Sequence, residues 1–162
     1  MICGGLGNID LGHANFIGGG TDNTIETDNL YNVISGGDSN RIQASSLGCT
    51  VSGGATNLIE TNCLYSVIGG GRQNINQAGA DYSVIGGGHR NTVQSNADYS
   101  VIGGGKANKT YAEYATIAGG QENSIRNGSK WAALGGGFSN LIRTNAEHAT
   151  ISGGFQNIIW DA

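Results

Sequence analysis

A five-residue pattern, Gly-Gly-x-x-Asn, occurs ten times in this 162-residue chain at a nearly constant interval, as at Asn74, Asn91 and Asn108. Glycine pairs at this interval disfavour helices, because each glycine costs about 1 kcal/mol relative to alanine inside a helix. The unit is also too short for helical or leucine-rich repeats, but it fits one turn of a β-solenoid. We therefore predict one all-β domain over residues 1–162, a parallel solenoid of ten turns, each of about 17 residues.

The pattern of apolar residues within a repeat predicts two short strands per turn. Counting from the repeat asparagine as position 0, an aliphatic residue occupies position −6, and another usually occupies position +2, as in Ile85 and Val93 around Asn91. Position −8 is small or polar. Because alternate strand residues point to opposite faces, positions −8 and −6 should face inward together, and so should positions 0 and +2.

The asparagine at position 0 is expected to form a ladder inside the coil. Stacked asparagine amides can bond to one another and to the backbone of the neighbouring turn. The predicted ladder consists of Asn23, Asn40, Asn57, Asn74, Asn91, Asn108, Asn123, Asn140 and Asn157.

Two outward positions carry residues that are unusual for a solvent-exposed surface. Position −7 is mostly β-branched, and an apolar stripe of this length favours an interface, although β-branched residues also simply prefer strands. The candidate interface residues are Val33, Thr50, Val67, Val84, Val101, Thr116 and Thr150. Position −9 forms a candidate contact column of aromatic residues, namely Tyr65, Tyr82, Tyr99, Tyr114 and Trp131.

Composition excludes several classes of protein. Thirty glycines without any proline argue against collagen, and no apolar run approaches the length of a membrane span. Net charge is −4 and no basic patch is evident, so nucleic acid is not expected as a partner. Three scattered cysteines indicate neither a disulfide framework nor a zinc site.

Residues that could carry chemistry do not form a recognisable catalytic pattern. Residues 103–110 resemble a phosphate-binding loop but lack its second glycine, where Asn108 stands. Asp81 and Asp98 share one repeat position, which a pair of catalytic carboxylates would also require, yet no cleft-forming insertion accompanies them. We therefore expect no enzyme activity, no catalytic residue, no metal and no cofactor.

The unit Tyr-Ser-Val-Ile-Gly-Gly-Gly-x-x-Asn, seen at residues 82–91 and again at 99–108, resembles repeats of two kinds of fibrous protein. It is similar to the head regions of trimeric autotransporter adhesins, and more closely to Gly-Gly-Gly repeats of viral and bacteriophage fibres. The resemblance implies a left-handed β-roll, three of which pack around an axis that Val67, Val84 and Val101 would face. The repeat in this chain is longer than the adhesin repeat, which is a departure from that family's pattern.

The expected function is a non-catalytic structural or adhesive module of an extracellular fibre, at a cell or virion surface. Its partners would be itself, as a homotrimer or stacked end to end, and a host-surface glycan or receptor. Two alternatives stay open. The Thr/Val face resembles that of plant ice-binding β-rolls, and the chain could also be the self-stacking subunit of a filament.

Overall fold

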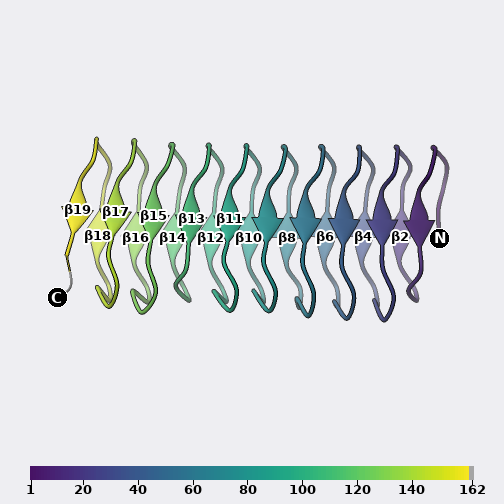
Figure 1. Ribbon diagram of the computed structural model, residues 1–162, viewed down its shortest axis with the longest axis horizontal. Coiled ribbons are helices and arrows are strands. Elements are labelled where there is room, and N and C mark those ends of the chain that lie inside the picture. Colours follow the sequence, from purple (N-terminus) through teal and green to yellow (C-terminus); the bar gives the residue numbers. More distant parts are fainter. Residues whose placement is uncertain (161–162) are drawn as a thin grey trace.

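The computed structural model describes residues 1–160, which wind into a straight coil with the two chain ends at opposite ends (Figure 1). In these residues nineteen strands, each two residues long, alternate between two parallel sheets, and none of these residues is helical. Each strand pairs in register with the strand one turn away, as Val84 does with Val67 and with Val101. The predicted all-β parallel solenoid with two strands per turn is therefore confirmed.

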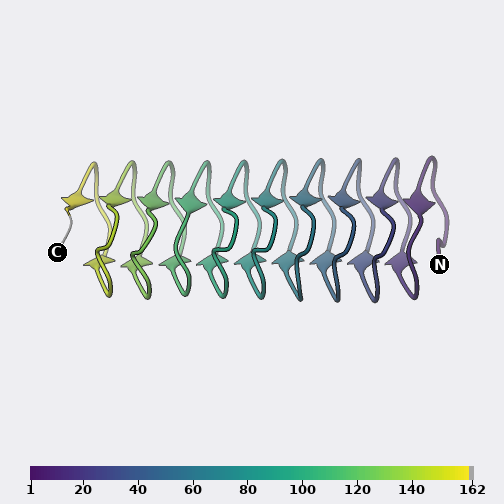
Figure 2. The ribbon, with the colours of Figure 1, turned by 60° about the horizontal axis from the view of Figure 1, so that its bottom comes forward.

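The larger sheet has ten strands, which hold positions +1 and +2 of each repeat. Figure 2 shows them as one of two rows of arrows along the coil. In spatial order they are β1 (Ile9–Asp10), β3 (Thr24–Ile25), β5 (Arg41–Ile42), β7 (Leu58–Ile59), β9 (Ile75–Asn76), β11 (Thr92–Val93), β13 (Lys109–Thr110), β15 (Ser124–Ile125), β17 (Leu141–Ile142) and β19 (Ile158–Ile159).

The smaller sheet has nine strands, which hold positions −7 and −6. They are β2 (Phe16–Ile17), β4 (Val33–Ile34), β6 (Thr50–Val51), β8 (Val67–Ile68), β10 (Val84–Ile85), β12 (Val101–Ile102), β14 (Thr116–Ile117), β16 (Ala133–Leu134) and β18 (Thr150–Ile151).

The coil makes about nine full turns rather than the ten predicted. The first repeat supplies β1 to the larger sheet, but to the smaller sheet it supplies only an isolated bridge between Ile2 and Ile17.

Both sheets bury one aliphatic column against the other, as the repeat predicts. Ile85, at position −6, and Ile125, at position +2, have no exposed surface. Asn76 and Thr110 replace the aliphatic at position +2 and are equally buried. A third inward column, at position −11, was not predicted. It is filled by small or polar side chains, which are those of Asn29, Ser46, Cys63, Ala80, Ala97, Ala112, Ser129 and Ala146.

One glycine in each repeat is required by the close approach of neighbouring turns. Gly88, at position −3, has a φ of +87°, and a Cβ added there would lie 2.2 Å from the carbonyl oxygen of Gly105. No side chain fits at that distance, and L-residues reach this conformation only at a cost. The Gly-Gly pattern therefore reflects both backbone conformation and turn-to-turn contact.

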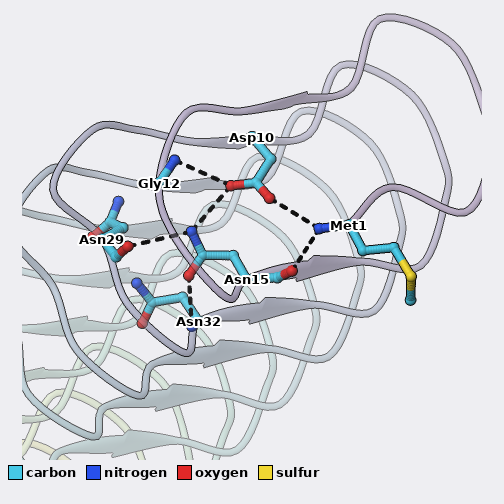
Figure 3. A network of polar contacts seen from close by, with 6 residues as sticks. All are labelled: Met1, Asp10, Gly12, Asn15, Asn29 and Asn32. Carbon is cyan, nitrogen blue, oxygen red and sulfur yellow. Dashed lines mark hydrogen bonds and ion pairs between the residues drawn. The ribbon is translucent and has the colours of Figure 1, made fainter.

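At the N-terminal end, Asp10 closes the interior with hydrogen bonds instead of an aliphatic side chain (Figure 3). Its carboxylate accepts hydrogen bonds from the Gly12 N–H at 3.2 Å and from Asn15 Nδ2 at 3.0 Å, and it forms an ion pair with the Met1 amine at 3.1 Å. Partial burial alone would raise the pKa of Asp10, but these donors outweigh it and hold the pKa below its ordinary value.

Candidate functional site

The repeat asparagines serve the interior and leave no group for a ligand. The Asn91 N–H donates to Asn74 Oδ1 at 3.0 Å, and Asn91 Nδ2 donates to the carbonyl oxygens of Gly87 and Gly105 at 2.9 and 3.1 Å. The equivalent bonds recur along the column, and side-chain bonds between successive asparagines join Asn40 to Asn57 at 3.1 Å. From Asn23 to Asn140 the column is buried, whereas Asn157 is exposed on the last turn.

The stripe at position −7 runs straight along the outside of the nine-stranded sheet. In-register pairing places Val67, Val84 and Val101 one above another, and Thr50 and Thr116 extend the same line. The valines are half-buried by their neighbours in the column, and Thr116 and Thr150 are exposed. Together, Phe16, Val33, Thr50, Val67, Val84, Val101, Thr116, Ala133 and Thr150 form what we call the valine stripe.

The aromatic column stacks its rings face to face at the corner two residues before the valine stripe. From Tyr65 through Tyr82, Tyr99, Tyr114 and Trp131 to His148, neighbouring ring centroids lie 4.9 to 5.5 Å apart. Tyr31 lies outside this stack because Gly48 occupies the position between it and Tyr65.

Stacking decides what the aromatic column can present to a partner. The five Tyr and Trp rings of the stack are 42–50% exposed, although their inner faces lie against one another. Sugars pack on aromatic faces, so this column offers them only its two end rings. Ring edges and tyrosine hydroxyls are what the surface displays along the rest of its length.

A groove runs along the outer face of the ten-stranded sheet. It has a volume of about 530 Å³ and is lined by positions −1 and +1 of four successive turns. Gln73 and Arg90 stand on one side, and Ile75, Thr92 and Lys109 on the other. Positions −1 and +1 flank the inward asparagine, so the trough between them runs along the coil axis.

Positive charge gathers beside this groove, which the sequence analysis did not find. Arg72, His89 and Lys106 occupy position −2 on three consecutive turns and are bridged to one another through their backbones. With Arg90 and Lys109 they form a cluster that we call the basic cluster. The expectation that the chain has no basic patch is therefore wrong. These side chains are scattered along the sequence, and only aligning the repeats by their asparagines brings them together.

The carboxylates and thiols singled out in the sequence have structural partners. Asp98 Oδ1 accepts a hydrogen bond from the Asp81 N–H at 3.0 Å, and Asp81 Oδ1 accepts one from the Leu64 N–H at 2.8 Å. Cys49 Sγ lies 3.2 Å from the Cys63 carbonyl oxygen, and both thiols are free. Burial raises the pKa of Cys49 to about 12 and that of Cys63 to about 11, which leaves both thiols unreactive.

Neither the phosphate-loop resemblance nor a metal cluster is supported in the described part of the chain. Lys109 and Thr110, from the phosphate-loop resemblance, form strand β13, and no helix follows them. Among residues 1–160 no three His, Cys, Asp or Glu side chains are placed to share a metal ion.

Comparison with models of protein families finds no match, and comparison with curated proteins finds none at a significant level. The structure has no helix in residues 1–160 that is long and apolar enough to cross a bilayer.

Proposed function

We propose that this chain is a non-catalytic structural and adhesive module of an extracellular fibre, at the surface of a cell or a virion. The observation that carries the proposal is the valine stripe, which stays β-branched or apolar over nine strands. Self-association as a homotrimer, with the stripe turned toward the other chains, would remove this surface from water.

Strand preference alone does not account for the stripe. The equivalent outward position of the ten-stranded sheet, position +1, is aliphatic on half of its strands, but it also accommodates Arg41, Lys109 and Ser124 in strands of the same length and register. The fold therefore tolerates polar and charged residues at outward strand positions. The near absence of charge along the valine stripe is better explained by a partner surface than by the needs of the strands.

The mechanism we propose is mechanical. Each turn is bonded to the next through two parallel strand pairs and through the asparagine ladder, so unfolding must break bonds on both sheets and inside the coil. Stacked tyrosines border the stripe, and their exposed edges and hydroxyls are suited to the rim of an interface, where tyrosine is enriched. This arrangement supports a stiff spacer that holds contact surfaces away from its base.

Sedimentation equilibrium of the chain and of matched variants tests the proposal. Val84→Arg combined with Val101→Arg places two charges on the stripe and should convert a trimer to a monomer. Ser124→Arg, on the outward position of the other sheet, is the control and should leave the mass unchanged. Equal effects of both changes would count against an interface at the stripe.

End-to-end stacking of copies is a second candidate, favoured by the two end turns. Exposed apolar residues occupy the same three positions at both ends: Leu6 and Phe155 at −2, Ile9 and Ile158 at +1, and Leu11 and Trp160 at +3. The open backbone edges of a parallel sheet also invite pairing. Light scattering that falls on Leu11→Lys, in a chain that otherwise forms filaments, would support stacking.

Ice binding has less support than self-association. A flat ice-binding face needs regular threonines, whereas the valine stripe has Thr50, Thr116 and Thr150 among valines and is bordered by the exposed aromatic column. An ice-recrystallisation assay on the unaltered chain and on the stripe variant separates the two, because an ice-binding face would be active in the unaltered chain and would lose that activity when Val84 and Val101 are replaced by arginine.

A further inference from the structure

The groove on the ten-stranded sheet combines three kinds of chemical group in one trough. Its sides carry the cations of Arg90 and Lys109, the hydroxyl of Thr92 and the amide of Gln73, and Ile75 adds apolar surface. Ligand-binding sites usually combine a small number of polar groups with apolar surface in one concave pocket. The trough crosses four turns and therefore suits a ligand that is extended along the coil axis.

In the part of the chain that the structure describes, the cations around the groove form no ion pair. Within residues 1–160, Arg41 pairs with Glu26 and Lys130 with Glu113, but no carboxylate lies within ion-pair distance of the basic cluster. The cluster contains four of the eight Lys and Arg residues, in a chain whose net charge is −4. Half of the Lys and Arg residues are thus concentrated on three neighbouring turns, although the protein as a whole is negatively charged.

Internal contacts hold part of this cluster in place. Gln73 Oε1 accepts a hydrogen bond from Arg90 Nε at 3.0 Å and lies 3.2 Å from His89 Nε2. This leaves the terminal nitrogens of Arg90 free to meet an anion. Reduced solvation lowers the pKa of His89, and the neighbouring positive charges of Arg90, Arg72 and Lys106 lower it further.

We propose that this groove binds an acidic saccharide, a sugar chain that carries carboxylate or sulfate groups. The Arg90 guanidinium and the Lys109 ammonium contact the anionic groups, Thr92 and the Gln73 amide bond to sugar hydroxyls, and Ile75 packs against the C–H face of a ring. Single-stranded nucleic acid fits less well, because it needs aromatic faces on which bases stack, and the residues lining the groove include none.

This inference deepens the adhesive part of the proposed function and rests on it, but it can fail separately. Self-association is assigned to the nine-stranded sheet, whereas the groove lies on the ten-stranded sheet. A trimer that binds no acidic saccharide overturns this inference alone, and a monomer that binds one overturns the interface alone.

Titration calorimetry at about 0.15 M ionic strength tests the binding with four probes. These are a heparin-derived sulfated oligosaccharide, an oligogalacturonate that carries only carboxylates, neutral dextran, and a single-stranded oligonucleotide of equal charge. We expect at least one acidic saccharide to bind at least tenfold more tightly than dextran and the oligonucleotide, and the tighter of the two acidic probes identifies the anionic group. Acidic saccharides that bind no better than dextran, or an oligonucleotide that binds as tightly as they do, would overturn the proposal.

Matched charge variants test the location. Arg90→Gln combined with Lys109→Gln should weaken binding at least tenfold, whereas Lys130→Gln combined with Arg143→Gln removes the same charge outside the residues that line the groove and should weaken it less than about threefold. Thermal melts monitored by circular dichroism confirm that each variant is folded. Equal losses in the two variants would mean that only the overall charge attracts the ligand, and the proposal would fail.

Discussion

The two sheets have similar buried faces and different exposed faces. Inward position −6 is aliphatic and buried on every turn after the first, and inward position +2 is buried from Ile25 to Ile142, with Asn76 and Thr110 in place of aliphatic residues. Outward position −7 of the nine-stranded sheet is β-branched or apolar throughout, whereas outward position +1 of the ten-stranded sheet mixes aliphatic residues, such as Leu58 and Ile75, with the polar or charged residues Arg41, Lys109 and Ser124. Both outward positions lie on two-residue strands in in-register sheets. We therefore infer that the valine stripe packs against other copies of the chain and that the ten-stranded sheet carries the ligand groove.

The largest losses of stability are expected for substitutions in the buried core, and the two sheets should lose similar amounts. Ile85→Ala in the nine-stranded sheet and Ile125→Ala in the ten-stranded sheet each remove a fully buried side chain, and each should lower the free energy of unfolding by about 2–5 kcal/mol. Chemical denaturation measures both values. A much smaller loss for one of them would show that the two inner faces are not equivalent and would break the comparison.

The asparagine ladder should show how burial sets the cost of the same substitution. Asn91→Ala leaves the Asn108 N–H and the Gly87 carbonyl without the hydrogen bonds they make to the Asn91 side chain and should cost about 3 kcal/mol, since each buried unsatisfied group costs about 1–3 kcal/mol. Asn157→Ala, at the exposed last turn, should cost less than about 1 kcal/mol. Thermal melts compare the two, and a melt of Asn91→Ala that matches the unaltered chain would refute the ladder.

The aromatic column should contribute less than the interior does. Tyr99 stacks on Tyr82 and Tyr114 at 4.9 and 5.0 Å, so Tyr99→Ala should cost about 1–2 kcal/mol, given about 0.5–1.5 kcal/mol for each aromatic pair. Tyr31→Ala is the matched control, because Tyr31 has the same left-handed backbone and no stacked neighbour. Equal losses in denaturation would show that the column stabilises through its backbone and not through its rings.

The smallest effect is electrostatic and depends on pH. Partial burial and the charge of Asp98 raise the pKa of Asp81 above 3.8, against the lowering effect of the Leu64 N–H. A raised carboxyl pKa destabilises the fold as pH rises from the unfolded value through the folded one. Asp98→Asn keeps the bond to the Asp81 N–H, removes the repulsion, and should raise stability at pH 7 by less than about 0.5 kcal/mol. Melts at pH 3 and pH 7 measure the difference, and a gain that is equal at both pH values would contradict this cause.

The repeat made most of the fold predictable because it encodes register directly. Once Asn74, Asn91 and Asn108 are aligned, the inward and outward residues of every turn follow from strand alternation. The third inward column, with Ala80 and Ala97, could not be read in this way. It depends on left-handed backbone at position −9 and at position +5, as at Tyr82 and Asn96, and apolar spacing does not reveal that conformation.

The basic cluster was missed for a different reason. Arg72, Arg90 and Lys106 stand about one repeat apart from one another, with no run of cations between them, so the local charge along the sequence does not reveal the cluster. In a solenoid the surface runs across the turns, so charge has to be compared between equivalent positions of successive repeats. Reading position −2 down the repeats, from Arg72 through His89 to Lys106, would have identified it.

Disulfide cross-linking tests the contrast between the two faces most directly. In a Cys3→Ser background, Val84→Cys places a thiol on the valine stripe and Lys109→Cys places one in the groove, where the native residue is more exposed. We predict that mild oxidation of dilute protein links copies through position 84 and leaves position 109 unlinked. Linking at position 109 without linking at position 84 would contradict the proposal that copies of the chain associate through the valine stripe.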